Sequence, residues 1–326
     1  MINFLKKQWF ILGMCLMILT GSLFPILGSK LNPDRITTNS LVIALFFLSG
    51  LSLPTETLKK GMKDLRLHVF IQGFIYIVCP LYFMLTAFPF KDVMDGRLVV
   101  GIYALACLPT TVSSCIVFTQ LSGGNTIGTV FNASLSNLAG IFISPLLLTL
   151  FLKGSGSPLP MEELMRIFHS LVIKMLIPFA IGQGLHINFK KFAVRYTSVF
   201  GRISNFFVLV IIFFGVARSA GNDSFQSYWK QLILPFVYLA LSHIFLLVLA
   251  FTGARLIRLN RENIISTLFT APQKTLAMGI PLLSTYFANR PEMLGIAILP
   301  ILFYHPFQLF IAGLIKNNIL VEQRLL

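Results

Sequence analysis

Long apolar runs, separated by short polar connections, follow one another along the whole chain. A helix that crosses a hydrocarbon layer of roughly 30 Å needs about 20 mainly apolar residues. The runs lack the alternation of polar and apolar residues that is typical of membrane barrel strands. The pattern predicts an all-α integral membrane protein with ten transmembrane helices, at about residues 8–28, 36–53, 65–88, 97–120, 125–152, 163–185, 200–218, 230–256, 262–287 and 292–315.

The composition supports this class. Of the 326 residues, 56% are hydrophobic and 11% are charged, which is more apolar than a water-soluble domain. Little chain is left for a soluble domain, so we expect a single transmembrane unit over residues 1–326. The first run, which follows Lys6 and Lys7, could instead be a signal peptide, but it is long and lacks an A-x-A cleavage site. Four cysteines fall within predicted helices at no metal-ligand spacing and are interpreted as packing residues: Cys15, Cys79, Cys107 and Cys115.

The distribution of charges predicts the topology. With the N-terminus in the cytoplasm, the inner loops and flanks carry fifteen cations and four acids, and the outer ones carry nine cations and seven acids. Cytoplasmic loops are enriched in Lys and Arg, so we expect a multi-pass protein of the cell membrane with both termini cytoplasmic. Short loops suit a bacterial inner membrane. The net charge of +15 then reflects contact with the lipid bilayer and predicts no nucleic-acid partner.

Two lysines, Lys174 and Lys274, are left once the loops and flanks are counted. No Asp or Glu falls inside a predicted helix core, so a carboxylate is not expected to bind an ion or carry a proton at mid-membrane. Lys174 precedes Pro178 by one turn, and its long side chain could reach a water-filled cleft, so both contact with substrate and no such contact are open for it.

The two halves of the chain, about 5–155 and 160–320, predict two inverted five-helix repeats, because an odd number of crossings reverses the second half. The fourth segment of each half carries a proline beside polar residues: Pro109 in LPTTVSSC and Pro272 in TAPQKTLAMG. A proline removes a backbone donor, and an unwound turn exposes groups that lipid cannot satisfy. Prolines kink membrane helices routinely, but paired interruptions in corresponding segments point to a transporter site.

The stretch LPTTVSSC, followed by FTQLSGGNTIGTVFNASLSNLAGIFISPLLL, resembles the crossover helix, GN-containing turn and next helix of the bile acid:sodium symporter family. LIPFAIGQGL is also similar, and APQKTLAMGIPLL is closer to a divergent branch. The resemblance spans about residues 5–320. It implies a panel domain of the first, second, sixth and seventh helices and a core domain of the other six. The broken fourth and ninth helices would cross in the core.

In sodium-coupled members, hydroxyl and amide groups near this crossing bind two sodium ions. The resemblance places their counterparts near Ser114 and Cys115 and near Asn132, Ser134 and Ser136. Where the family has a Glu-x-Gly-x-Gln-Asn motif, this chain runs from Thr270 to Thr275 as TAPQKT. The glutamate of the motif is absent here, and a lysine is present instead. Cys115 stands where the family has an asparagine, and a neutral thiol is a poor ligand for a hard cation. This departure puts two-sodium coupling of the usual kind in doubt.

Lys274 offers two alternatives. Its ammonium would stand in for a bound sodium, or, once desolvated, it would release and regain a proton. A lysine that reaches the interface would do neither, but this one lies about twelve residues from either end of its segment. Sodium or a proton is the expected coupling ion, and no cofactor is expected. The candidate binding residues are Thr110, Thr111, Ser113, Ser114, Asn132, Ser136, Pro272, Gln273, Lys274 and Thr275.

Histidines and amides complete the set of polar residues within the helices. His243 and His305 are candidate proton carriers, or else hydrogen-bonded core residues. Four amides are expected to bond across helices without a transport role: Gln72, Gln183, Asn205 and Gln308.

The cationic side chains, the lack of buried acids and the half-helix ends favour a small organic anion as substrate. We therefore expect a secondary active transporter that works by alternating access on a bile-acid-like or other amphipathic carboxylate or sulfate. The alternative is a membrane regulator or scaffold that keeps the fold without transport. An enzyme is not predicted, because the helices carry no acid pair, His-Glu metal motif or GxSxG.

Overall fold

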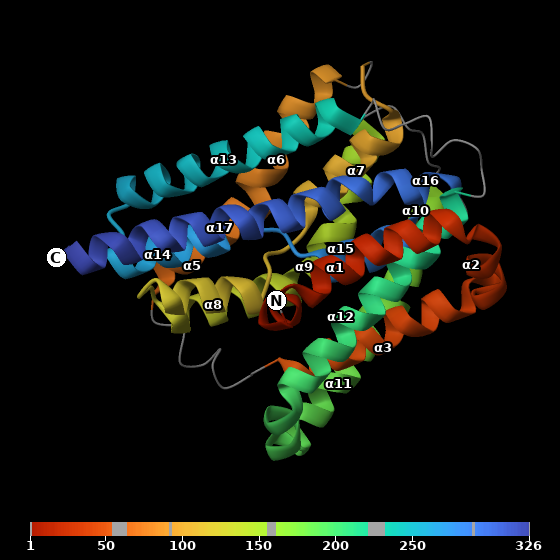
Figure 1. Ribbon diagram of the computed structural model, residues 1–326, viewed down its shortest axis with the longest axis horizontal. Helices are drawn as coiled ribbons and strands as arrows, with labels where there is room; N and C mark the ends of the chain where they lie inside the picture. The colour runs from red at the N-terminus through yellow and green to blue at the C-terminus, as the bar shows by residue number, and fades with distance from the viewer. Residues whose placement is uncertain are drawn as a thin grey trace. The chain divides into compact units, whose positions relative to one another are not determined.

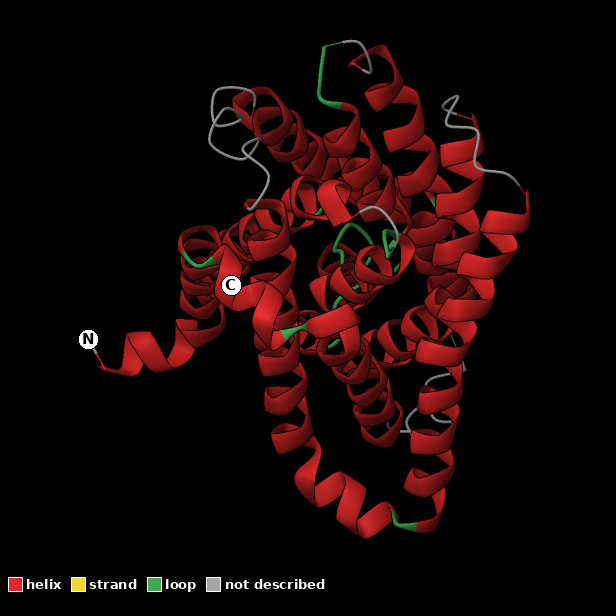
Figure 2. Ribbon diagram, turned by 90° about the vertical axis from the view of Figure 1, so that its right-hand side faces the viewer, coloured by secondary structure: helices red, strands yellow, loops and turns green. Residues whose placement is uncertain are grey.

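The computed structural model describes residues 2–53, 64–90, 93–154, 161–220, 232–288 and 291–325. Every regular element within these ranges is a helix, as Figures 1 and 2 show. Seven helices in the described chain are long and apolar enough to cross a membrane, or eight if one bent pair counts as a single span. The prediction of an all-α membrane protein is confirmed, whereas ten spans and the two inverted repeats stay predictions.

The chain falls into two compact units, which we describe separately. Unit 1 comprises Met1–Leu53, Pro158–Leu232 and Ala277–Leu299, and unit 2 comprises Pro54–Ser157, Ile233–Leu276 and Pro300–Leu326. Each unit is assembled from segments that are far apart in the sequence. The panel and core domains implied by the resemblance, and a single unit over residues 1–326, stay predictions.

Unit 1 is built around two helices: α12 (Lys190–Ala220) lies against α1 (Ile2–Leu23) and α3 (Ile36–Ser52), and α11 (Ile177–Asn188) lies against α3. Gly50 on α3 faces the carbonyl of Phe179, and Gly182 on α11 faces the carbonyl of Phe47, so a side chain at either glycine would collide with backbone. Small residues allow such close approach of membrane helices. The elements are α1 (Ile2–Leu23), α2 (Pro25–Leu31), η1 (Pro33–Arg35), α3 (Ile36–Ser52), α10 (Met161–Leu171), η4 (Val172–Leu176), α11 (Ile177–Asn188), α12 (Lys190–Ala220), α16 (Pro291–Ala297) and most of α15 (Leu276–Tyr286).

The first predicted span is not a single straight helix. Between α1 and α2 the chain bends by 100°. Pro25 occupies the first turn of α2, where its missing N–H costs nothing, but it cannot continue α1. The prediction of one continuous helix over 8–28 is therefore wrong at Phe24.

Unit 2 contains the two interruptions that the prolines predicted. The segment 97–120 is divided into α7 and α8, and the segment 262–287 into α14 and α15. Residues 262–276 of the second segment and most of α17 belong to this unit, whereas α15 beyond Leu276 belongs to unit 1. Its elements are α5 (Leu65–Gly73), η2 (Phe74–Val78), α6 (Cys79–Ala87), η3 (Phe88–Phe90), α7 (Gly96–Cys107), α8 (Ser113–Leu121), α9 (Thr126–Gly154), α13 (Ile233–Leu256), α14 (Arg261–Thr270) and α17 (Leu299–Leu325).

Candidate functional site

Lys274 lies between α14 and α15, and its side chain is buried inside unit 2, with only 1% of its surface exposed. Its Nζ donates to three backbone carbonyls, those of Ile75 at 3.2 Å, Ala106 at 3.0 Å and Leu108 at 2.9 Å. An ammonium has three donors and no acceptor. All three of its hydrogens are therefore used by the backbone.

The local structure explains why these three carbonyls are available. Ile75 lies in η2, a π-helical turn in which the Cys79 N–H bonds to the Phe74 carbonyl, five residues back. Such a turn takes a carbonyl out of the regular ladder. Ala106 and Leu108 flank Cys107, the last residue of α7. The last carbonyls of a helix lack intrahelical donors and carry the negative end of its dipole, which favours a cation.

The interruption after α7 leaves a run of carbonyls that all find donors. Six consecutive carbonyl groups, from Ala106 to Thr111, accept hydrogen bonds from side chains or backbone within unit 2. This pairing explains how irregular backbone is tolerated there, since buried polar groups need partners. The donors, in chain order of the carbonyls, are Lys274 Nζ, Ser144 Oγ, Lys274 Nζ, Thr275 N, Asn137 Nδ2 and Cys115 Sγ.

The interruption after α14 is held by two residues of α17. Gln308 accepts a hydrogen bond from the Lys274 N–H and donates to the Lys274 carbonyl, each at 2.8 Å. The Tyr304 hydroxyl donates to the carbonyl of Pro272 at 3.0 Å. Together these bonds fix the backbone on both sides of the Lys274 side chain.

The two candidate proton carriers lie next to these residues. Because the Tyr304 hydroxyl gives its only proton to Pro272, the Nδ1 of His243, 2.9 Å from that hydroxyl, is the donor of their bond. Gln308 Nε2 lies 3.0 Å from Nδ1 of His305. Both histidines are thus hydrogen-bonded around the backbone that carries Lys274, and a role in proton transfer stays a prediction.

Three of the predicted site residues meet directly. Thr111 Oγ1 donates to Gln273 Oε1 at 2.8 Å, and Ser114 Oγ lies 2.6 Å from Thr111 Oγ1 and 3.4 Å from the same amide oxygen. The Thr275 N–H bonds to the carbonyl of Pro109 at 2.9 Å. The two proline-containing interruptions are therefore in direct contact within unit 2.

The other predicted residues are placed differently. Ser113 is exposed, and the hydroxyl of Thr110 is buried without a hydrogen-bond partner. Asn132 Oδ1 accepts from Gln72 at 3.1 Å, and Asn132 Nδ2 lies 2.9 Å from His68 Nδ1. The Ser136 carbonyl accepts from Tyr76, and its hydroxyl bonds back to Ala133. Asn132 and Ser136 thus join α9 to α5 and η2 rather than to Lys274.

A sequence comparison identifies the class of protein. The sequence profile of the SBF-like CPA transporter family matches residues 8–319. This chain belongs to that family. The resemblance seen in the sequence is confirmed, and this SBF-like protein is a membrane transporter, not an enzyme.

Curated relatives of this SBF-like transporter match it over nearly their whole length. Sodium/bile acid cotransporter 7-B of Xenopus laevis is 32% identical over 325 residues, which cover 97% of this chain and 92% of the relative. Sodium/bile acid cotransporter 7 of Rattus norvegicus is 30% identical, covering 96% and 93%. Putative symporter YfeH of Escherichia coli (strain K12) is 26% identical, covering 95% and 92%.

Several residues that complete the site of this SBF-like transporter were not expected from the sequence. Tyr304, Asn137 and Ser144 are ordinary helical residues in the pattern, and only the fold brings them to the interruptions. Gln308 and Gln72 were expected to bond across helices, and both do so. The hydroxyls of Thr110, Ser134 and Thr270 are buried without hydrogen-bond partners, and a coupling sodium or proton stays a prediction.

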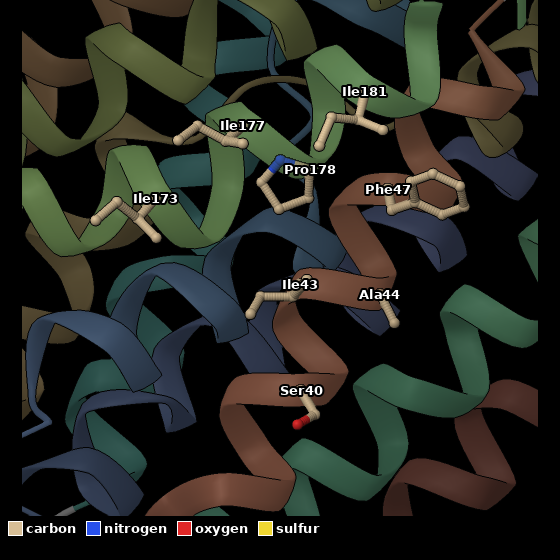
Figure 3. A pocket seen from close by; sticks show the side chains of 8 residues that line it. All are labelled: Ser40, Ile43, Ala44, Phe47, Ile173, Ile177, Pro178 and Ile181. Carbon is tan, nitrogen blue, oxygen red and sulfur yellow. The ribbon is translucent and has the colours of Figure 1, made fainter. Parts of the chain in front are cut away.

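Unit 1 carries a groove of about 490 Å³ between α3 and the η4–α11 segment. Figure 3 shows Ser40, Ile43, Ala44 and Phe47 on one side and four residues of η4 and α11 on the other. The lining is apolar except for Ser40, and it contains no charged side chain. Lys174, which lies in η4, is half-buried and is not part of this lining.

Proposed function

We propose that this SBF-like transporter moves an organic anion by alternating access, and that Lys274 supplies a permanent positive charge where its relatives would use a dissolved coupling ion. The contact of Lys274 Nζ with three carbonyls carries this proposal. The amine is bound to the chain, so this charge neither enters nor leaves during a transport cycle.

The same geometry favours the permanent cation over the proton carrier. A neutral amine has two hydrogens, so it would leave one of the carbonyls of Ile75, Ala106 and Leu108 without a donor and point its lone pair at an oxygen. A buried acceptor without a partner costs about 1–3 kcal/mol. The three-carbonyl arrangement thus supports a lysine that stays protonated.

Charge balance supports an anionic substrate. The two ion pairs found in the described chain, Arg97–Asp95 and Arg166–Glu162, do not involve Lys274. Positive charge within the helices therefore lacks a protein counter-ion there, and a carboxylate or sulfate would supply one. The names of two relatives refer to sodium and bile acid, which supports an amphipathic anion as the class to test first.

The proposal is tested with purified protein in liposomes, by measuring uptake of cholate and estrone sulfate. We expect uptake by the native chain without a sodium gradient, and no uptake by Lys274→Gln. Each variant is first checked for a monodisperse peak in detergent, so that misfolding is not counted as loss of transport.

Three outcomes would contradict the proposal. Uptake that needs sodium and is unchanged in Lys274→Gln would show that the lysine does not replace the ion. Uptake driven by a pH gradient, with the response lost in that variant, would make Lys274 the proton carrier. Saturable binding of cholate without any flux would favour the alternative of a membrane regulator or scaffold that does not transport.

A further inference from the structure

Arg35, at the junction of η1 and α3, is a second buried cation, in unit 1. Only 9% of its surface is exposed, although its position at the start of an apolar run suggested a loop residue. The sequence places Arg35 in the flank of a helix and did not predict that its side chain would be buried. Arg35 needs its own explanation, because an arginine is rarely buried without a partner.

The backbone holds Arg35 in an unusual conformation. Asp34 and Arg35 have φ angles of 46° and 63°, in the left-handed region that residues with a side chain rarely adopt. Asn32 fixes this turn, because its side chain donates to Thr38 Oγ1 at 2.7 Å and accepts from the Thr38 N–H at 3.0 Å. Strain of this kind is often found where a side chain has a function.

The guanidinium has unused donor capacity. Its Nη2 donates to the backbone carbonyl of Ser284, while Nη1 is buried without a hydrogen-bond partner. The hydroxyl of Ser284, a residue with 1% exposure, is also buried without a partner. Asp34, the adjacent acid, is exposed, and neither ion pair of the described chain includes Arg35. Two neighbouring residues of unit 1 thus carry buried donors that lack an acceptor.

Two further cations interact electrostatically with Arg35. They are Arg218 on α12, which is exposed, and Lys174 in η4, which is half-buried. Like charges repel most strongly where the surroundings are poor in water. An anion bound among them would turn this repulsion into attraction.

Lys274 cannot provide the contact that an anionic substrate needs, because its three hydrogens are already used by carbonyls. We propose that Arg35 Nη1 and Ser284 Oγ form an anion-binding site in unit 1 that receives the carboxylate or sulfate of the transported anion. A guanidinium suits this task, since it stays charged and presents several donors in a fixed plane. This inference rests on the proposed function and deepens it by naming the group that recognises the substrate's charge.

Binding to the detergent-purified full chain tests the site, with inorganic sulfate and cholate as separate probes. Loss of one charge-assisted hydrogen bond is worth a factor of about ten to one hundred in affinity. We expect Arg35→Gln to weaken binding of both probes by that factor, and Ser284→Ala to weaken it about fivefold. Arg35→Lys keeps the charge but not the planar set of guanidinium donors. Its affinity for both probes should lie between those of the native chain and Arg35→Gln.

Lys30→Gln is the matched control, because it removes an exposed cation from the same unit. It should bind both probes with native affinity. Native affinity for both probes in a monodisperse Arg35→Gln protein would overturn the proposal. So would an equal loss of affinity in Lys30→Gln, because the effect would then be one of overall charge.

An anionic lipid headgroup has the same chemistry as the substrate's anion, so nanodiscs of phosphatidylcholine with and without phosphatidylglycerol form a second arm. Binding of phosphatidylglycerol that Arg35→Gln abolishes, with cholate affinity unchanged, would overturn the assignment to substrate. Native uptake by Arg35→Gln, with no uptake by Lys274→Gln, would sink this inference and leave the proposed function standing. Binding of cholate that depends on Arg35, without flux in any variant, would support the anion-binding site and contradict the proposed transport.

Discussion

Unit 2 and unit 1 each bury a cation, and the two cations are treated in opposite ways. Lys274 in unit 2 has every hydrogen paired with a backbone carbonyl. Arg35 in unit 1 has one nitrogen without a partner and other cations around it. A cation whose donors are all used by the protein serves the structure, whereas one with a donor left over can serve a ligand. This difference is the basis on which we assign a structural role to Lys274 and a binding role to Arg35.

The sharpest test of this comparison replaces each cation with an apolar residue of similar length. Lys274→Met would leave three carbonyls without donors, and we expect it to lower the free energy of unfolding by about 2–5 kcal/mol. Arg35→Met would lose the hydrogen bond to the Ser284 carbonyl but would also remove an unpaired donor and a repulsive charge, so these effects oppose each other and we expect a change within about 1 kcal/mol. Thermal unfolding of both variants in detergent, without ligand, measures the difference. Equal destabilisation by the two substitutions would remove the distinction between the two charges.

Gln308→Leu tests whether the backbone that presents Lys274 must be fixed. The variant loses the two hydrogen bonds to the Lys274 N–H and carbonyl, so we expect a loss of about 2–4 kcal/mol in stability and a fall in cholate uptake of about tenfold. Gln183→Leu, on α11 of unit 1, is a comparison for removal of a half-buried amide elsewhere. Native uptake by Gln308→Leu would show that the function of Lys274 does not depend on these two hydrogen bonds.

Unit 1 is held by close packing, which a pair of glycine substitutions measures. Gly50→Ala would place a methyl group against the carbonyl of Phe179, and we expect it to destabilise unit 1 by about 1–3 kcal/mol. Gly184→Ala, on the same helix as Gly182, meets no atom within 4 Å and should be neutral or slightly stabilising. Thermal unfolding checks both, and equal effects would argue against steric contact as the cause.

The smallest expected effect is at the direct contact between the two interruptions. Thr111→Val removes the hydroxyl that donates to Gln273 and should cost about 1 kcal/mol in stability. Ser113→Ala, at an exposed hydroxyl two residues away, should have no measurable effect. A larger cost at Ser113 than at Thr111 would show that the polar contacts have been assigned to the wrong hydroxyls.

Local chemistry was enough to predict much of unit 2's site. Proline beside polar residues predicted both interruptions, because a missing N–H and competing polar side chains disfavour a continuous helix. No other charged residue lies in the core of the predicted segment 262–287, so Lys274 was predicted to be a site residue. The bend at Phe24 was missed because Pro25 lies within an apolar run whose length alone fits one span.

The sequence by itself determined the membrane class, the positions of the interruptions and the presence of a lysine at one of them, since these depend on hydropathy and on the backbone chemistry of single residues. Only the tertiary structure decided what each cation touches. Lys274 meets three carbonyls from two distant stretches of chain, and Arg35 is turned inward by a left-handed backbone and reaches Ser284, 249 residues further along. Contacts between such distant residues depend on how helices pack, which no local pattern of residues encodes.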